Sequence, residues 1–409
     1  MTSIASTRGK PRVLLTYGWV RSSYAALRSL SAKGIDVWVA DTHRVGMCQW
    51  SNRRRGFREY SSPFVDEGAF IDSIVSICGE LNISVIFPSH NETEILARHR
   101  HRLPTGSDVL LPDAATCAVF NNKAQAHALA ESVGLRVPRR LRCASVAEVP
   151  AAFRYLDRGG GVVMKLLTGN SSKGVFYPQT ASEAQATFER LISEFALAPE
   201  RYPQMEERIS GFGAGCSVAY WKGRRIASIC HRRLREKVAT GGTSTLRECI
   251  ESPALAHAAG LLFDATQWHG LAMAEFKVCE RTGEAWFIEV NPRMWGSIPM
   301  AVAAGVDFPY LMWLAADEGY DRAVAYAAES PPRIGFRGRW LLGDALFACS
   351  ELARLKPVNA MRALISVRCD ALDDLHMDDL GAFAGEFAHY ATRFLATRSM
   401  NPGDKGTVR

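Results

Sequence analysis

The residues with the clearest chemical potential lie in a segment that has the pattern of a β-hairpin. Two apolar runs flank a turn at Thr282-Gly283, and the second run ends in Asn-Pro-Arg. With the turn centred there, Glu275 lies nearly opposite Glu289. The two-residue period of a strand also places Glu289, Asn291 and Phe287 on one face. The sequence therefore predicts two carboxylates that face each other among apolar strands.

Opposed carboxylates in a sheet repel each other, and partial burial makes each charge costly, so this arrangement requires a counter-charge. A bound cation would supply it. Glu275, Glu289 and Asn291 offer carboxylate and amide oxygens without His or Cys beside them, which suits a hard ion. So few protein ligands leave room for phosphate oxygens, as Mg²⁺ usually requires. A solvated strand face is the alternative, and we favour the metal site.

The segments before this hairpin alternate short apolar runs with helical spacing. Residues 13–16 and 35–40 are apolar runs, and residues 22–32 between them have the spacing of a helix. The same alternation continues and predicts a parallel sheet flanked by helices over residues 12–112. The turn after the first run has one glycine, Gly18, where a dinucleotide fold would have Gly-x-Gly-x-x-Gly, so a nicotinamide site is not supported.

Two loops of this region are candidates for substrate binding. Open parallel sheets bind ligands beyond the carboxyl ends of their strands. Residues 18–23 and 88–92 follow predicted strands at that edge of the sheet. Plain turns are the alternative for both loops, because turn-forming residues are common in them.

Composition argues against several classes of protein. The chain has 409 residues with 49 Lys and Arg against 42 Asp and Glu, and its basic segments are separated and lack interleaved aromatic residues. Residues 1–12 lack the apolar core of a signal peptide, and the most apolar stretch, residues 298–316, is interrupted by two prolines and an aspartate. The ten cysteines are too widely spaced for a redox pair or a zinc knuckle. We therefore expect a cytoplasmic protein that binds neither nucleic acid nor membrane.

Five segments, in their order along the chain, resemble the ATP-grasp superfamily of ATP-dependent carboxylate-amine ligases. They are similar to the nucleotide-binding region of the carbamoyl-phosphate synthase large chain and of biotin carboxylase, over roughly residues 12–320. The segments are Asn122-Lys123 before a helix, Val163-Met164-Lys165, the loop from Gly169 to Gly174, Met205-Glu206-Glu207-Arg208-Ile209, and Phe287-Ile288-Glu289-Val290-Asn291-Pro292-Arg293. The last segment is the most specific of the five.

The resemblance implies a mixed α/β and α+β protein with three parts. An N-terminal α/β domain with a parallel sheet would cover residues 12–115. A two-subdomain ATP-grasp module would follow over residues 116–325, with a small subdomain at about residues 138–205. Residues 326–409 would form a small C-terminal extension.

The resemblance covers residues 331–409 least. Their patterns predict helices over residues 340–355 and 380–396 and a short strand over residues 363–368. Five aspartates between residues 370 and 379 suggest a second metal site. Nothing in the sequence fixes their geometry, and helix caps and solvated loops are the commoner roles of such aspartates, so we favour them.

By the resemblance, ATP is clasped between the two subdomains. Lys123 and Lys165 resemble the two lysines that reach the nucleotide phosphates, and plain surface charge is their alternative. The polar loop after the second lysine resembles the flap that covers the phosphates, and a hairpin turn is its alternative. The flap residues that would contact ATP are Gly169, Ser171, Ser172, Lys173 and Gly174.

Glu206, Glu207 and Ile209 resemble the segment that holds adenine in this superfamily. Glu206 would lie near the amino edge of the base, and main-chain groups of Glu207 and Ile209 would pair with it. Many members carry a glutamate before the next strand that binds the ribose hydroxyls. This chain has Gly211-Phe212-Gly213-Ala214-Gly215 at that place, so no residue is assigned to the ribose.

The resemblance also implies how phosphate is transferred. Glu275, Glu289 and Asn291 would be ligands of Mg²⁺, with Mn²⁺ as a substitute, at the ATP phosphates. Arg293 would stabilise the transferring phosphoryl group and the acyl phosphate that it makes, and Lys173 of the flap is counted with it as a catalytic candidate.

A basic segment before a second glycine loop resembles the substrate region of some members. Arg232 or Arg233 would hold the acid substrate through a bidentate guanidinium, beside the loop at Gly241-Gly242. We prefer Arg233, because the superfamily places it near the reaction centre. A solvated basic strand end is the alternative.

We therefore predict an ATP-dependent ligase that activates a small-molecule carboxylate as an acyl phosphate and couples it to an amine, releasing ADP and phosphate. Two alternatives stay open: carboxylase-like or carbamoyl-phosphate-type phosphorylation, and a nucleotide-binding protein without catalysis. The implied partners are the acid, the amine, ATP and Mg²⁺, and a homodimer is left open. The sequence does not name the acid or the amine, because variable loops build the pocket walls.

Overall fold

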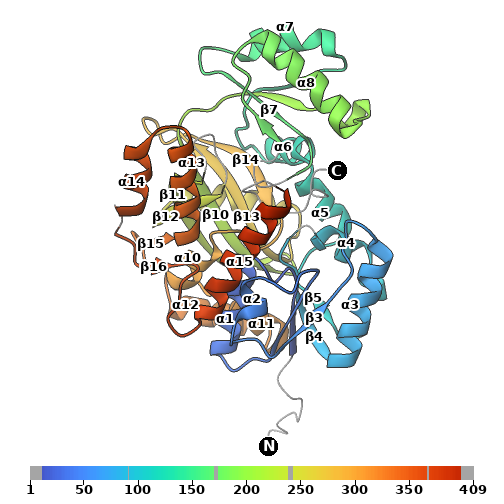
Figure 1. Cartoon of the computed structure of the whole chain (residues 1–409). Helices are drawn as coiled ribbons and strands as arrows, with labels where there is room; N and C mark the ends of the chain where they lie inside the picture. The colour runs from blue at the N-terminus through green and yellow to red at the C-terminus, as the bar shows by residue number, and fades with distance from the viewer. Residues whose placement is uncertain (1–11, 91, 170–173, 238–242, 366–367, 398–409) are drawn as a thin grey trace, which may run out of the picture.

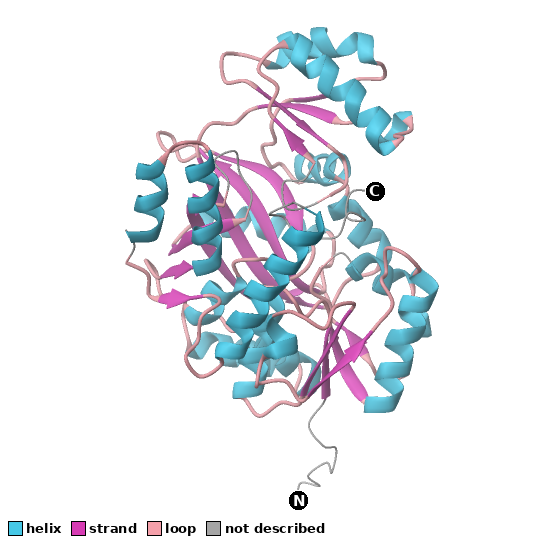
Figure 2. Ribbon diagram, viewed as in Figure 1, coloured by secondary structure: helices cyan, strands magenta, loops and turns pink. Residues whose placement is uncertain are grey.

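The computed structural model describes residues 12–90, 92–169, 174–237, 243–365 and 368–397. Within these residues the chain forms three β-sheets with helices around them (Figures 1 and 2). A small sheet with its helices lies at one end of the molecule, the largest sheet lies in the middle, and the N-terminal sheet lies at the other end. The predicted mixture of α/β and α+β structure is confirmed, whereas the boundaries of the three predicted domains stay predictions.

The N-terminal sheet is parallel, with strand order β3-β2-β1-β4-β5. Its strands are β1 (Arg12–Leu15), β2 (Val37–Asp41), β3 (Gly56–Glu59), β4 (Ile83–Phe87) and β5 (Asp108–Val109). Its helices are α1 (Arg21–Ala32), α2 (Met47–Trp50), α3 (Glu67–Leu81), α4 (Glu92–Arg98), the short turn η1 (Arg100–Arg102) and α5 (Ala114–Asn121). Val13 and Leu15 share a core with α1, whereas Leu14 shares one with α3. Helices thus cover both faces, as predicted for a parallel sheet.

The small sheet is antiparallel, with strand order β6-β9-β7-β8. Its elements are β6 (Arg140–Arg142), η2 (Val146–Glu148), α7 (Val149–Leu156), β7 (Val162–Lys165), β8 (Val175–Phe176), α8 (Ala181–Phe195), η3 (Pro199–Arg201) and β9 (Gln204–Glu207). Thr180 caps helix α8, and its hydroxyl accepts from the Glu183 N–H at 3.1 Å. It buries Ala184, Phe188 and Leu191, a stripe with helical spacing, in the core of this part.

The large sheet has strand order β14-β13-β10-β11-β12-β15-β16. Its strands are β10 (Phe212–Trp221), β11 (Arg224–Glu236), β12 (Ser244–Ile250), β13 (Gly270–Val278), β14 (Ala285–Asn291), β15 (Arg337–Arg339) and β16 (Ala371–Leu372). Neighbouring strands from β14 to β15 are antiparallel, and β16 is parallel to β15. The last two strands come from the C-terminal part of the chain, so that part completes the sheet.

A β-bulge changes the predicted register of the β13-β14 hairpin. Glu275 pairs with Glu289, as predicted, but Phe276 pairs with Phe287, so Ile288 is an extra residue on β14. Phe287 therefore lies in the apolar core with Phe276, on the face opposite to Glu289. The prediction that Phe287 shares a face with Glu289 is wrong, because the two-residue period of a strand does not hold across a bulge.

Apolar layers cover both faces of the large sheet. On one face, alternate residues of β10 and β13 contact α6 (Lys123–Ser132) and α9 (Pro253–Ala265). On the other face, α10 (Ile298–Ala303), α11 (Phe308–Asp317) and α12 (Tyr320–Glu329) share one continuous core with α1. Most of the stretch 298–316 thus forms the helices α10 and α11, which share this core. Among the described helices, none combines the length and apolar character that crossing a bilayer requires.

The C-terminal part adds α13 (Leu341–Ala353), α14 (Pro357–Ile365) and α15 (Leu380–Thr397). The helices predicted over residues 340–355 and 380–396 are confirmed by α13 and α15. The strand predicted over residues 363–368 is wrong, because the chain is helical through Ile365. Ala360 and Ala363 are buried, three residues apart, and this helical spacing lets α14 lie against α13.

Two glycines bring α15 into backbone contact with α2. A Cβ on Gly385 would lie 2.2 Å from the carbonyl oxygen of Gly46, and a Cβ on Gly381 would lie 2.4 Å from that of Trp50. The two glycines are one helical turn apart, so they form one small-residue face of α15. The C-terminal part therefore lies directly against the N-terminal region (Figure 1).

We expect Gly385→Ala to lower the free energy of unfolding by about 1–3 kcal/mol, because the added methyl overlaps a backbone carbonyl. Alanine favours a helix over glycine by only about 1 kcal/mol, which is too little to offset this overlap. Urea denaturation of the purified protein measures the change. Gly79→Ala in α3 is the control, since nothing lies within 4 Å of its Cβ position, and it should stabilise the protein. Equal effects of the two substitutions would contradict the close approach.

Candidate active site

A cleft of about 550 Å³ lies between the small sheet and the large sheet. Figure 1 shows the small sheet, with β7, beyond the end of the large sheet that carries β13 and β14. The predicted site residues that line the cleft are Lys165, Glu206, Glu207, Ile209, Arg233, Glu275 and Glu289. Tertiary structure thus brings the residues predicted for the nucleotide and those predicted for the metal to one place.

Lys165 and Glu206 form a buried ion pair on the small sheet. Lys165 Nζ lies 2.6 Å from Glu206 Oε2, and Gln204 Nε2 donates to the other oxygen, Oε1, at 2.9 Å. Burial raises the pKa of Glu206, but the Lys165 ammonium, together with His127 and the hydrogen bond from Gln204, holds that pKa below its ordinary value. Glu206 therefore holds the ammonium at the wall of the cleft. A contact between Glu206 and the amino edge of adenine stays a prediction.

Glu207 lies at the rim of the cleft and turns its side chain to Arg139. Arg139 Nε donates to Glu207 Oε2 at 2.7 Å, and the backbone N–H of Arg139 donates to Oε1 at 2.9 Å. The backbone N–H of Glu207 donates to the carbonyl of Arg139 at 2.9 Å. The N–H of Glu207 is therefore used within the sheet, and the pairing of adenine with main-chain groups of Glu207 and Ile209 stays a prediction.

Lys123 connects the base of the predicted flap to the large sheet. It is the first residue of α6, which Asn122 caps by accepting from the N–H of Ala124 at 3.0 Å. Lys123 Nζ donates to the carbonyl of Gly169 at 2.9 Å and lies 3.8 Å from Glu289 Oε2. Burial lowers the pKa of Lys123, and the charge of Glu289 opposes that shift. Both predicted phosphate-binding lysines are thus buried and face carboxylates.

Glu275 is held by two neighbours on the large sheet. Asn291 Nδ2 donates to Glu275 Oε1 at 2.8 Å, and the guanidinium of Arg233 forms an ion pair with Oε2. Burial raises the pKa of Glu275, Arg233 lowers it, and the opposed Glu289 raises it again. Arg233 therefore supplies part of the counter-charge that the opposed carboxylates require. The sequence pattern had assigned all of that counter-charge to a bound metal ion.

Arg233 reaches Glu275 across β10, which lies between β11 and β13. Gly215 on β10 pairs with Glu275 on one side and with His231 on the other. A Cβ on Gly215 would lie 2.6 Å from His231 Cε1, and one on Gly213 would lie 3.1 Å from Arg233 Cδ. Gly213, in the segment where the resemblance would place a ribose-binding glutamate, therefore leaves room for Arg233 to cross β10, and Gly215 leaves room for His231.

The two arginines considered for the acid substrate face different surroundings. Arg232 Nε donates to Glu248 on β12 at 2.7 Å. Arg233 lines the cleft, and its guanidinium lies 3.3 Å from Glu236 in addition to its ion pair with Glu275. Of the two arginines, only Arg233 lines the cleft. Its charge is already shared between the carboxylates of Glu236 and Glu275.

The predicted metal ligands lie together at the end of the hairpin. Glu275 is opposite Glu289, and Asn291 bonds to Glu275. Their side-chain donors are all oxygen, the set that Mg²⁺ prefers. In the described part of the chain, no group of three or more His, Cys, Asp or Glu side chains is arranged to hold a metal. The candidate site therefore consists of two carboxylates and one amide, which fits Mg²⁺ shared with phosphate oxygens.

Arg293 lies between the hairpin and the N-terminal sheet. Burial lowers the pKa of Arg293, and the charges of Glu289 and Glu92 oppose that shift. Glu92 follows β4, within the candidate substrate loop 88–92, and its carboxylate accepts from the Thr16 hydroxyl at 2.5 Å. Arg293 therefore lies where the carboxyl edge of the N-terminal sheet approaches the carboxylates of the hairpin.

Five predicted residues lie outside the described part of the chain: Ser171, Ser172 and Lys173 of the flap, and Gly241 and Gly242 of the substrate loop. The two ends of the flap are described. The carbonyl of Gly174 accepts from the N–H of Leu166 at 2.8 Å, which continues the pairing of β7 with β8. The hairpin predicted around the flap is thus confirmed as far as its ends.

Sequence reasoning missed two polar residues that support the buried ion pair. His127 Nε2 lies 2.9 Å from the carbonyl of Ile288, and its Nδ1 lies 3.2 Å from Gln204 Nε2. Burial lowers the pKa of His127, so its ring is neutral and links α6 to the bulge on β14 and to β9. A signal was present: His127 lies one helical turn after Lys123, and Gln204 lies two strand residues before Glu206.

Comparison with known proteins gives a family model and a set of solved structures. A model described as "ATP-grasp in the biosynthetic pathway with Ter operon" matches residues 214–336, which run from β10 to the segment before β15. A search of curated proteins gives no match.

Pyruvate carboxylase from Rhizobium etli is similar over 76% of this chain and 28% of its own, with a TM-score of 0.61 and 18% identity. The biotin carboxylase domain of Hydrogenobacter thermophilus 2-oxoglutarate carboxylase, a dimer with MgADP, ADP and bicarbonate, is similar over 80% and 72%, with a TM-score of 0.58 and 15% identity. L-amino acid ligase from Bacillus licheniformis is similar over 80% and 78%, with a TM-score of 0.59 and 14% identity. Such identities support the fold alone.

Breaking the Lys165–Glu206 pair tests whether it is one buried unit. We expect Glu206→Gln or Lys165→Met to lower the free energy of unfolding by roughly 3–5 kcal/mol each, because each leaves an uncompensated buried group. The double variant should lose less than the sum of the two, as measured by urea denaturation. Arg44→Gln is the control, since its ion pair with Glu59 is largely exposed. Additive losses would show that the two side chains act independently.

Proposed function

We propose that this chain, which has the ATP-grasp fold, is an ATP-dependent ligase that joins a small-molecule carboxylate to an amine through an acyl phosphate, releasing ADP and phosphate. The observation that carries the proposal is the charge pattern of the cleft. Lys165 faces it from the small sheet, and the opposed Glu275 and Glu289 face it from the large sheet. A triphosphate with its metal ion would match positive charge on one side and negative charge on the other.

The reaction needs activation because a carboxylate oxygen is a poor leaving group at neutral pH. Transfer of the γ-phosphoryl group breaks its bond to the β-phosphate oxygen and forms a bond to the substrate carboxylate, which gives ADP and a mixed anhydride. The amine then attacks the acyl carbon, and phosphate leaves with the carboxylate oxygen while the amine loses a proton. When bound, Mg²⁺ would offset the negative charge of the phosphates.

The residues of this chain would bind and orient the reacting groups. Glu275, Glu289 and Asn291 would hold Mg²⁺, and Lys123 and Lys165 would hold phosphate oxygens. Their burial supports this role, because a buried ammonium beside a carboxylate is fixed in position before the nucleotide binds.

Arg293 would stabilise the phosphoryl group during transfer, and the candidate substrate loops lie on its side of the site. Arg293 lines one small pocket with Phe87 and Pro88 at the end of β4, which supports this placement, because the acid would then reach the phosphoryl group from the carboxyl edge of the N-terminal sheet. Arg233 would act by holding Glu275 in position, and contact with the acid would come second to that role.

A carboxylase-like reaction is the second candidate, since the similar structures include pyruvate carboxylase and a biotin carboxylase domain. It differs in the acceptor: bicarbonate, rather than an organic acid, would receive the phosphoryl group. Measuring ADP release with bicarbonate alone, with panels of organic acids, and with acids plus amines separates the two. Mass spectrometry of the product then distinguishes an amide from a carboxylated or phosphorylated product.

We expect Glu289→Gln and Lys165→Ala to reduce ADP release at least ~100-fold, because each removes charge that faces the phosphates and the metal. Glu284→Gln on the same hairpin is the matched control, since Glu284 pairs with Arg136 on an exposed surface, and it should retain the full rate. Steady-state ADP release with Mg²⁺ in excess is the measurement. Undiminished turnover in Glu289→Gln or Lys165→Ala would overturn the site assignment.

A further inference from the structure

The aspartates between residues 370 and 379 bind other parts of the protein, so the candidate second metal site is not supported. Asp374 accepts from the backbone N–H groups of Leu341 and Leu342, at 3.1 and 2.8 Å, and so caps α13. Asp373 and Asp379 lie in the interior instead of in solvated loops, with 2% exposure each. These acids therefore attach the C-terminal part to the rest of the molecule.

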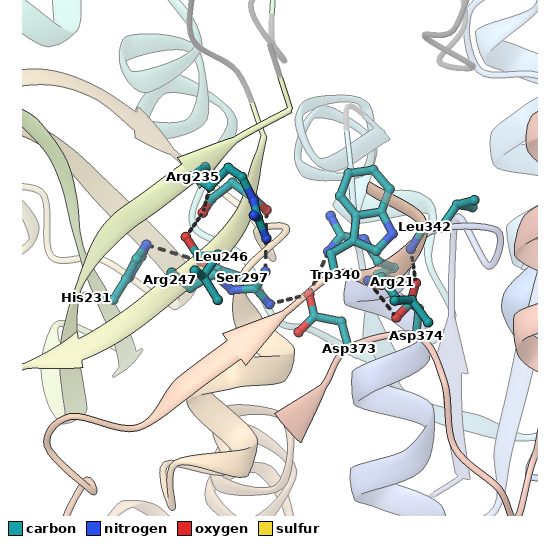
Figure 3. Close-up of polar contacts among 12 residues, drawn as sticks. Arg21, His231, Arg235, Leu246, Arg247, Ser297, Trp340, Leu342, Asp373 and Asp374 are labelled. Atoms are coloured by element: carbon teal, nitrogen blue, oxygen red, sulfur yellow. Dashed lines mark hydrogen bonds and ion pairs between the residues drawn. The ribbon is translucent and has the colours of Figure 1, made fainter. Parts of the chain in front are cut away.

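Asp373 binds two arginines from distant parts of the chain. Its Oδ2 lies 2.7 Å from Arg21 Nη1 and also forms an ion pair with Arg247. Arg21 is the first residue of α1, and Arg247 lies on β12 with no exposed surface. Figure 3 shows Asp373 between the two guanidinium groups. One buried carboxylate thus ties the N-terminal region to the large sheet.

Arg247 is the direct cross-strand partner of Arg233. Like charges directly opposite each other destabilise a sheet, so each arginine needs its own acid. Arg233 binds Glu275 at the cleft, and Arg247 binds Asp373 of the C-terminal part. Burial, together with both arginines, lowers the pKa of the adjacent His231 to about 3, so its ring adds no charge at neutral pH. Asp373 thereby neutralises the charge that stands next to Arg233.

Arg21 also lies close to the segment that follows Arg293. A Cβ on Gly296 would lie 3.5 Å from Arg21 Nη2, and Gly296 comes three residues after Arg293. On its other side, the Arg21 guanidinium lies 3.6 Å from the centre of the Trp340 ring, and the Trp340 indole N–H donates to Glu386 on α15 at 3.1 Å. The C-terminal part therefore holds Arg21 against the segment that follows β14.

We propose that Asp373 is a positioning residue of the candidate active site. By binding Arg21, it fixes the segment that follows Arg293. By binding Arg247, it neutralises the charge beside Arg233, so that Arg233 stays bound to Glu275. The C-terminal part thus positions residues of the site, although none of its own described residues lines the cleft. The kinetic half of the test rests on the proposed ligase function, and the structural half does not.

The kinetic test compares Asp373→Asn with Asp379→Asn. Asp379 is the matched control because it is buried in the same segment and binds the N-terminal region, accepting from the Tyr24 hydroxyl at 3.1 Å and from the Asn52 N–H at 3.0 Å. We expect Asp373→Asn to lower the rate of ADP release at least ~10-fold more than the control does. The Kd for ATP should change less than about threefold, because Asp373 is not among the residues lining the cleft.

The structural test measures backbone hydrogen exchange over residues 290–298 by mass spectrometry. We expect faster exchange in Asp373→Asn than in the wild type and in Asp379→Asn, because the segment loses the support of Arg21. This readout needs no turnover. A wild type that releases no ADP with any acid or amine would overturn the ligase proposal, and exchange would still decide the positioning role.

Two further variants exclude a general folding defect. The double variant Asp373→Asn with Arg247→Gln removes the guanidinium that Asp373→Asn leaves uncompensated beside Arg233. We expect part of the lost rate of ADP release to return in it. Asp373→Glu keeps the charge and serves if Asp373→Asn does not fold, with a smaller loss expected. Equal losses in Asp373→Asn and Asp379→Asn, or exchange over residues 290–298 that no Asp373 variant changes, would overturn the proposal.

Discussion

The opposition of Glu275 and Glu289 on neighbouring strands is the constraint on which the surrounding structure depends. Two carboxylates in cross-strand register repel each other, and the apolar layers around the sheet deny them full solvation. Positive groups therefore reach them from two sides: Arg233 from β11 and Lys123 from the start of α6. The candidate site is built from elements far apart in the sequence because no single element could neutralise this pair.

The same constraint accounts for the glycines of β10. Arg233 can bind Glu275 only by lying across the strand between them, and a side chain at Gly213 would occupy that path, while one at Gly215 would meet His231. Arg247 is the cross-strand partner of Arg233 and carries the same charge. It therefore needs an acid of its own, which is Asp373. Two ion pairs, Glu275 with Arg233 and Arg247 with Asp373, thus connect the cleft through the large sheet to the C-terminal part, and Figure 3 shows Asp373 between Arg247 and Arg21.

The family model and the similar structures agree with the resemblance that the motifs carry, and residues of three of the five motifs line one cleft. The C-terminal part has its own means of attachment. Its small residues Gly381 and Gly385 allow backbone contact with α2, while its acids bind arginines of the N-terminal region and the large sheet. This part therefore bridges two regions that also meet at Arg293.

Sequence alone determined the features that depend on local pattern. The parallel N-terminal sheet, the hairpin with Glu275 opposite Glu289 and two helices of the C-terminal part, α13 and α15, all follow from periodicity and turn residues. The resemblance to the ATP-grasp superfamily was also found from the sequence alone, because its motifs are short and contiguous. The strand predicted over residues 363–368 failed, since a short apolar run fits a helix equally well.

Only tertiary structure decided the features that depend on contacts between distant segments. The bulge at Ile288 moved Phe287 to the opposite face, and no local pattern marks a bulge. The bonds from Arg233 to Glu275 and from Asp373 to Arg247 join residues that are 42 and 126 positions apart. The physical reason is that charge pairing and close packing depend on distance in space, which a linear pattern does not contain.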